Sequence, residues 1–229
     1  MGIPIYENLG ILNYRLQGVI TGDIVGSTAI NLDWRETLLD CIRKSVDELS
    51  ILSPLKMELF RGDSFQIIVD KPEEALKVAV LLRAMLKSQT PKSSKTVWDA
   101  RIALGVGSIS YNTNKIVISD GEAFQLSGRE LDAIGKGRLT IKTRWEDVND
   151  ELKVITAFAD DIITGWSILQ AQVIYTALLY QTPQKIIASK TNKSAQNISK
   201  VLGAAKEKLI RVFLDRYSIL MVKKLTECI

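Results

Sequence analysis

Two aspartates, each at the end of a predicted strand, are the residues of this sequence best placed to bind a metal ion. Asp23 follows the apolar segment at residues 16–22, and Asp63 lies in the short connection between two further apolar segments. Mg²⁺ and Mn²⁺ prefer oxygen ligands, so both carboxylates and the backbone carbonyl of Ile24 could hold such an ion while triphosphate oxygens complete its shell. Taken singly, either acid is also consistent with a solvated or capping residue of an ordinary turn.

The residues beside these aspartates are suited to a phosphate group. The turn at residues 25–28 can direct backbone N–H groups at phosphates, helped by the positive end of the helix that follows. We assign to nucleotide binding Val25, Gly26, Ser27, Thr28 and Gly62. The predicted cofactor is Mg²⁺ or Mn²⁺, and the predicted partner is a nucleoside triphosphate or a related nucleotide.

The absence of histidine limits the chemistry further. It excludes Ser-His-Asp triads, Cys-His dyads, His-ligated zinc and His general bases. Cys41 and Cys228 lie far apart and have no metal-ligand spacing. The sequence shows neither a leader peptide nor a long uncharged apolar run, so we expect a soluble, cytoplasmic protein without a membrane partner.

The elements that must position these residues follow from the apolar pattern, which predicts the order β-α-β-β-α-β and then a further α-β. The strands are expected at 16–24, 55–60, 64–69, 97–109 and 139–143, and the helices at 33–49, from 72 and at 120–134. This order is a split βαβ, ferredoxin-like pattern of the α+β class, and it predicts an antiparallel sheet covered by helices on one face. Because the first strand then lies beside the third, Asp23 and Asp63 can meet at one sheet edge.

Four segments between residues 16 and 143 resemble the class III nucleotidyl cyclases. Residues 23–28 (DIVGST) and 62–65 (GDSF) are similar to the two segments whose aspartates hold two metals in those enzymes, and 101–107 (RIALGVG) resembles their R-I-G-I-H-T-G strand. Residues 121–129 (GEAFQLSGR) resemble the helix G-x-x-V-N-x-A-x-R. The resemblance implies that Gln125, in place of the Asn, and Arg129 are the catalytic residues that face the ribose and the phosphates.

The sequence departs from active cyclases at the two positions that usually read the base, where it has Leu59 and Ile118. The base therefore stays unassigned. The same arrangement followed by a short C-terminal helix-turn-helix is similar to the SatD-like bacterial proteins, which share an opening G-D-I-V-x-S and a later D-G-x-A-F. Membership of that group would not by itself imply enzymatic activity.

The C-terminal residues form a pattern of short helices at 166–180, 184–190 and 194–202, with Thr182 as the expected N-cap and Pro183 as the first residue of the second helix. This is the bihelical pattern of a helix-turn-helix. From residue 180 onward there are ten Lys/Arg against three Asp/Glu, as expected of a segment that meets a polyanion. We assign to DNA binding Ser194, Gln196, Asn197, Lys200 and Lys206. The alternative is a plain helical dimerisation bundle with a solvated basic face.

We therefore predict a nucleotidyl cyclase-like domain at 1–145, a connecting helix at 146–165 and an all-α helix-turn-helix domain at 166–229. The predicted function is a nucleotide-binding regulator that couples the metal and nucleotide site to DNA. Two alternatives stay open, an active nucleotidyl cyclase and an inert interaction module fused to a DNA-binding domain. The apolar residues near the C-terminus look like core or dimer contacts and predict a homodimer; they are Leu214, Ile219, Leu220 and Val222.

Overall fold

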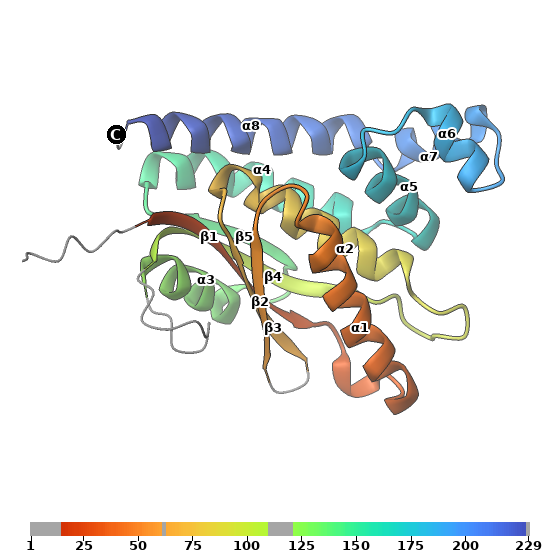
Figure 1. The fold of residues 1–229 in the computed structure, drawn as a ribbon, viewed down its shortest axis with the longest axis horizontal. Coiled ribbons are helices and arrows are strands. Elements are labelled where there is room, and N and C mark those ends of the chain that lie inside the picture. Colours follow the sequence, from red (N-terminus) through yellow and green to blue (C-terminus); the bar gives the residue numbers. More distant parts are fainter. Residues whose placement is uncertain (1–14, 61–62, 110–120, 228–229) are drawn as a thin grey trace, which may run out of the picture.

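The computed structural model describes residues 15–60, 63–109 and 121–227, and shows a five-stranded sheet between layers of helices (Figure 1). The strands are β1 Arg15–Ile24, β2 Leu55–Phe60, β3 Ser64–Val69, β4 Ala100–Ile109 and β5 Leu139–Thr143. The helices are α1 Leu32–Leu49, α2 Ala75–Ser88, α3 Glu122–Ala133, α4 Glu146–Thr164, α5 Ile168–Leu179, α6 Gln184–Lys190, α7 Ala195–Ala204 and α8 Glu207–Thr226, with short 3₁₀ helices η1 Ser27–Ala29 and η2 Pro72–Glu74. These elements confirm the predicted order of strands and helices.

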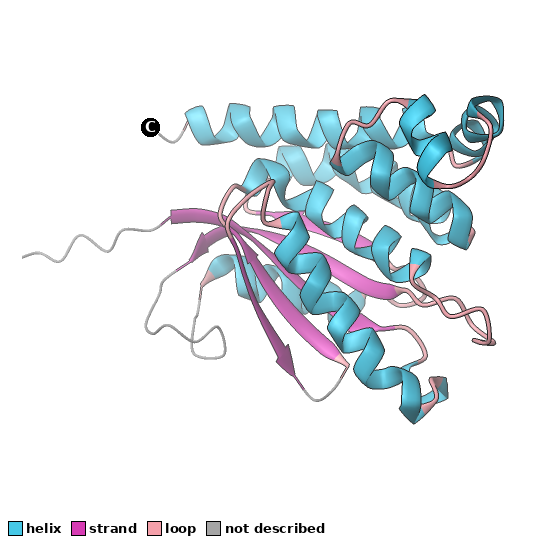
Figure 2. Ribbon diagram, turned by 45° about the vertical axis from the view of Figure 1, so that its right-hand side comes forward, coloured by secondary structure: helices cyan, strands magenta, loops and turns pink. Residues whose placement is uncertain are grey.

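The strand order β2-β3-β1-β4-β5 confirms the split βαβ arrangement, because β1 lies between β3 and β4 and is antiparallel to both. Two expectations were wrong. The sheet is not wholly antiparallel, since β5 pairs in parallel with β4 after the crossover through α3. Helices cover both faces, with α1 and α2 on one side and α3 on the other (Figure 2).

The second covered face follows from the apolar residues on both sides of β1. Ile20 joins the main core with α2, whereas Val19, its neighbour on the opposite face, forms a smaller cluster with Ala123 of α3. The approach of α3 is close, because a Cβ built at Gly105 of β4 would lie 2.2 Å from the Ala123 carbonyl oxygen. Glycine at this position therefore allows α3 to pack against the sheet.

The C-terminal helices pack directly on the rest of the chain. Helix α5 lies against α2, and α8 lies against α4 and η2. The Tyr217 hydroxyl of α8 donates to the Pro72 carbonyl at 2.8 Å, and a single cluster of buried apolar residues extends from Ile20 of β1 to Met221 of α8. Among the described residues, no helix is long and apolar enough to cross a membrane.

Candidate functional site

The turn after β1 is held at the sheet edge by two backbone hydrogen bonds. The Ile24 N–H donates to the Asp63 carbonyl at 3.0 Å, and the Val25 N–H donates to the Asp99 carbonyl at 2.9 Å. Gly26 then adopts a left-handed conformation with φ of 64°, which favours glycine. This residue turns the chain into η1, so that Ser27 and Thr28 lie beside Asp63.

A cavity of about 230 Å³ opens between this turn and α1. Asp63 is its acidic side chain, and the Asp63 Oδ2 accepts a hydrogen bond from the Ser27 hydroxyl at 2.8 Å. Arg35 of α1 lines the same cavity and donates to the Ser27 carbonyl at 3.4 Å. Ile24, Thr28, Ile30, Leu38 and Leu39 complete the lining. The cavity thus combines one carboxylate, one guanidinium and two hydroxyls with an apolar wall.

A second, more open cavity of about 890 Å³ adjoins the first, because Thr28, Ile30 and Arg35 line both. Its other lining residues are Ala29, Asn31, Trp34, Ser93, Ser94, Lys95 and Thr96. The second cavity therefore adds an aromatic ring, a lysine and further hydroxyls to the carboxylate and guanidinium of the first. Together the two cavities have the size and mixed lining of a small-molecule site.

Asp23 lies at the same edge of the sheet as Asp63, but its carboxylate pairs with an arginine. Arg101 of β4 donates its Nε to the Asp23 Oδ1 at 2.8 Å and its Nη2 to the Oδ2. This contact raises the pKa of Arg101. Successive side chains of a strand alternate between faces, and Thr21, two residues before Asp23, contacts Ser127 of α3. Asp23 thus lies toward the α3 side, whereas Asp63 lines the cavity on the α1 side. In the described part of the chain, Asp23 pairs with Arg101 and Asp63 bonds to Ser27.

The donor set of the first cavity fits a hard cation carried by a nucleotide. Among the described residues, no group of three acidic, cysteine or histidine side chains could hold a metal alone. Mg²⁺ is commonly bound by one or two carboxylates plus substrate phosphates. Asp63 supplies one carboxylate of such a shell, and Ile24 lines the same cavity. Asp23 would join the shell only after its ion pair with Arg101 is broken.

Gln125 and Arg129 lie on α3, on the opposite face of the sheet from α1. Both are exposed, whereas Ala123 and Ser127 of the same helix are buried against the strands. Their spacing of four residues puts them on one outward helix face. The chain does not bring this pair to the Asp63 cavity. Gly62 and Ile118 lie outside the described residues, and Leu59 is a half-buried residue of the edge strand β2.

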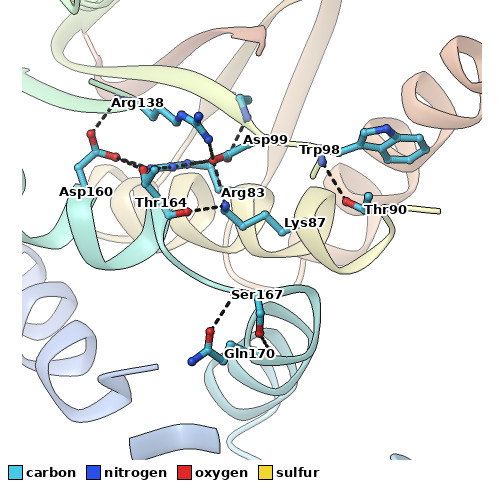
Figure 3. A network of polar contacts seen from close by, with 11 residues as sticks. Arg83, Lys87, Thr90, Trp98, Asp99, Arg138, Asp160, Thr164, Ser167 and Gln170 are labelled. Atoms are coloured by element: carbon cyan, nitrogen blue, oxygen red, sulfur yellow. Dashed lines mark hydrogen bonds and ion pairs between the residues drawn. The ribbon is translucent and has the colours of Figure 1, made fainter. Parts of the chain in front are cut away.

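Asp99, whose carbonyl accepts the Val25 N–H of the turn, belongs to a buried network of charged residues (Figure 3). Asp99 accepts hydrogen bonds from Arg83 Nε and Nη2, both at 2.9 Å, and from Arg138 Nη1 at 2.8 Å, and the Lys87 ammonium lies 3.3 Å from it. Burial alone would raise the pKa of Asp99, but the hydrogen bonds and the charge of Arg83 lower it to about 2. Arg83 also pairs with Asp160 of α4 at 2.7 Å.

In the C-terminal part, α6 and α7 are short helices joined by a turn in which Asn192 has a left-handed φ of 53°. Ile187 and Ile198 are buried between them. Ser194 is the N-cap of α7 and accepts a hydrogen bond from the Asn197 N–H at 3.1 Å. Gln196, Asn197, Lys200 and Lys206 are exposed. The expected cap of α6 was one residue early, because Pro183 rather than Thr182 is the N-cap, and Gln184 is the first helical residue.

Sequence reasoning missed the two arginines of the site. Arg35 carried a usable signal, since it is a cation in the first turn of the helix that follows the phosphate-type turn. Arg101 carried none, because its contact with Asp23 depends on the register between β1 and β4. Only a known strand pairing would have placed the two side chains opposite one another.

No protein-family model matches the sequence, and a search of curated proteins finds no match. Solved structures with a similar arrangement of elements are adenylyl and guanylyl cyclase domains. They include the adenylate/guanylate cyclase/hydrolase from Silicibacter pomeroyi, with 19% identity, a TM-score of 0.45 and coverage of 61% of this chain and 80% of that chain. A bacterial light-regulated adenylyl cyclase has 12% identity, a TM-score of 0.44 and coverage of 56% and 75%. A guanylyl cyclase has 16% identity, a TM-score of 0.45 and coverage of 56% of this chain and 75% of that chain. Similarities this low assign no activity to the chain.

Proposed function

We propose that the chain is a regulator that binds a nucleoside triphosphate with Mg²⁺ or Mn²⁺ at the Asp63 cavity and contacts DNA through α6 and α7. The observation that carries the nucleotide site is the convergence of Asp63, Ser27, Thr28 and Arg35 on one cavity beside the turn at residues 25–28. The turn would face the phosphates, and Arg35 would neutralise their charge.

In this proposal Asp63 would hold the metal ion, and the adjoining cavity would take the rest of the nucleotide. Trp34 and Lys95 line that second cavity and offer an aromatic side chain and a further cation. The bound metal would neutralise the charge of the phosphates. Because Asp63 is the carboxylate of the first cavity, we expect nucleotide affinity to depend on the metal.

A path of contacts supports coupling between the turn and the C-terminal helices. The Val25 N–H donates to the Asp99 carbonyl, and the Asp99 carboxylate pairs with Lys87, whose ammonium donates to the Thr164 carbonyl at 3.0 Å. Two residues later, the Trp166 indole N–H donates to the Ala205 carbonyl, between α7 and α8, at 2.9 Å. A ligand that shifted the turn would therefore act on contacts that continue to the junction of α7 and α8.

The nucleotide proposal is tested by calorimetric titration of the full chain with ATP, GTP, CTP and UTP, each with and without Mg²⁺ or Mn²⁺. We expect metal-dependent binding of at least one nucleotide, and loss of that binding in Asp63→Asn. Asp47→Asn, an exposed acid at the other end of α1, is the matched control and should bind as the unmodified chain does. Equal affinity of Asp63→Asn and the unmodified chain would reject the site.

Turnover is the alternative that the cyclase resemblance implies, by attack of the 3′-hydroxyl on the α-phosphate with release of pyrophosphate. The outward positions of Gln125 and Arg129 favour binding without turnover within one chain. Chromatography of a nucleotide incubated with the protein and metal distinguishes the two. Formation of a cyclic nucleotide and pyrophosphate, lost in Arg129→Ala, would make the chain an enzyme.

The DNA proposal rests on the exposed polar residues at the start of α7 and on the basic charge from residue 180 onward. In fluorescence anisotropy over a salt series, Lys200→Ala or Lys206→Ala should each reduce the slope of log affinity against log salt by about one unit. Lys44→Ala, an exposed lysine of α1, is the control and should leave the slope unchanged.

Gln196→Ala or Asn197→Ala should instead reduce discrimination between DNA sequences, because amide side chains read base edges and a good contact is worth about 1–3 kcal/mol. Absence of DNA binding at low salt, with and without nucleotide, would favour the helical dimerisation bundle.

A further inference from the structure

The surface formed by α4 and α8 exposes large apolar side chains along two neighbouring helices. Phe158 of α4 is 69% exposed and Val212 of α8 is 66% exposed, and they are accompanied by Val154, Leu209, Ile219 and Val222. Single exposed apolar residues are normal on a soluble protein, whereas a contiguous group marks an interaction surface. We call these six residues the α4–α8 face.

The spacing of the residues shows that the face follows the helices. Leu209, Val212, Arg216 and Ile219 recur at steps of three, four and three residues, which places them on one side of α8. Helix α4 runs antiparallel to α8, because Glu151 pairs with Arg216 and the earlier Asp147 pairs with Lys224. In Figure 1, α8 lies along the outside of the molecule next to α4.

The same face contains a hollow. A cavity of about 360 Å³ lies between the two helices. Its apolar lining includes Ile155, Phe158 and Ile162 of α4 and Leu209, Val212 and Phe213 of α8. The face therefore presents both projecting apolar side chains and an apolar recess. An interface between identical copies about a two-fold axis needs these two features on one surface.

The charges of the two helices are complementary. Helix α4 carries six acidic side chains against one lysine, and α8 carries five basic side chains against two acidic ones. Within one copy, Asp147, Glu151 and Asp160 already pair with Lys224, Arg216 and Arg83, whereas Asp161 of α4 and Lys208 of α8 are exposed. When two copies meet face to face about a two-fold axis, α4 of each can lie on α8 of the other, so exposed charges of opposite sign can pair twice. A surface for anionic lipid would be basic around its apolar residues, and the acidic α4 opposes that partner.

We propose that the α4–α8 face binds a second copy of this chain, with Phe158 of each copy packed against α8 of the other. This inference rests on the surface alone and does not depend on nucleotide or DNA binding. It separates the predicted dimer residues, since Ile219 and Val222 are exposed on the face whereas Leu214 and Leu220 are buried in the core. The two α6–α7 units would then be related by the same two-fold axis.

The test is the oligomeric state of the full chain by sedimentation velocity over a wide range of protein concentration. We expect a dimer whose dissociation constant rises at least about thirtyfold in Phe158→Lys and in Val212→Asp, because each places charge in an apolar contact twice. Ile51→Asp is the matched control, since Ile51 is 65% exposed outside this face, and it should leave the dimer unchanged. Far-ultraviolet circular dichroism and thermal unfolding check that each variant is folded.

Mixing the two variants tests the pairing of α4 with α8. A mixed dimer has one contact in which the new lysine meets the new aspartate and one contact that is unmodified, so the mixture should dimerise more tightly than either variant alone. A monomeric unmodified chain at all concentrations, or a dimer that Val212→Asp leaves intact, would overturn the proposal. A dimer without recovery on mixing would overturn the α4-to-α8 arrangement. None of these outcomes bears on nucleotide binding, which is measured separately.

Discussion

The network around Asp99 and the cavity around Asp63 both bring acidic and basic side chains together, and the Val25 N–H of the turn beside the cavity donates to the Asp99 carbonyl. They differ in exposure. Asp99 and Arg83 are fully buried, whereas Arg35 at the Asp63 cavity is exposed and Asp63 is half-buried. A buried carboxylate whose oxygens are occupied by three cations has a structural role, because losing a partner leaves charge in the core. A carboxylate bonded to a hydroxyl at an open cavity can exchange that bond for a ligand.

The largest effect is expected from Asp99→Ala, which should lower the free energy of unfolding by about 3–5 kcal/mol. The reason is that Arg83 and Lys87 would stay buried without their main counter-charge. Urea denaturation measures the change. Asp40→Ala removes an exposed ion pair with Arg43 and should cost less than about 1 kcal/mol. Similar losses in the two variants would remove the distinction between buried and exposed pairs.

Acid should weaken the fold through the same residue. The pKa of Asp99 falls from its ordinary value of 3.8 to about 2 in the folded chain, so its contribution is present above pH 3.8 and is lost as the pH falls toward 2. The shift corresponds to roughly 2 kcal/mol. Urea denaturation at pH 5 and at about pH 2 should show this component in the unmodified chain and lack it in Asp99→Asn. An identical pH dependence in both proteins would contradict the assignment.

Arg101→Ala tests an ion pair at the sheet edge, and the expected loss of stability is below about 1 kcal/mol because Arg101 is 42% exposed. The variant should also free Asp23 as a metal ligand. We therefore expect metal-dependent nucleotide affinity to stay the same or to increase, measured by calorimetry beside thermal unfolding. A loss of affinity would instead assign Arg101 a direct role in binding the phosphates.

The smallest effect on stability is expected from Asp63→Asn, within about 0.5 kcal/mol, because asparagine retains an oxygen that can accept from Ser27. The change removes the negative charge that a metal requires. We expect Asp63→Asn to lose nucleotide binding and to keep its thermal unfolding temperature, whereas Asp99→Ala should lose stability. Strong destabilisation by Asp63→Asn would instead make Asp63 a structural residue.

The local elements of this protein were determined by the sequence. The apolar repeats gave the ranges of β2, β3 and β5 as the structure has them, and the order of elements implied that β1 lies beside β3. The turn after Asp23 and the hydroxyls at positions 27 and 28 were also visible, because Gly-Asp and small residues at a strand end are local signals. Such features depend on neighbouring residues, which the sequence displays directly.

The tertiary structure decided which side chains meet. Helix α2 buries Arg83 and Lys87 as well as its apolar residues, because α5 packs against it and Asp99 and Asp160 balance the two positive charges. Likewise, Asp23 pairs with Arg101, which lies opposite it on β4, because strand register decides which side chains lie side by side. These contacts join residues at least twelve positions apart, and no local pattern encodes them.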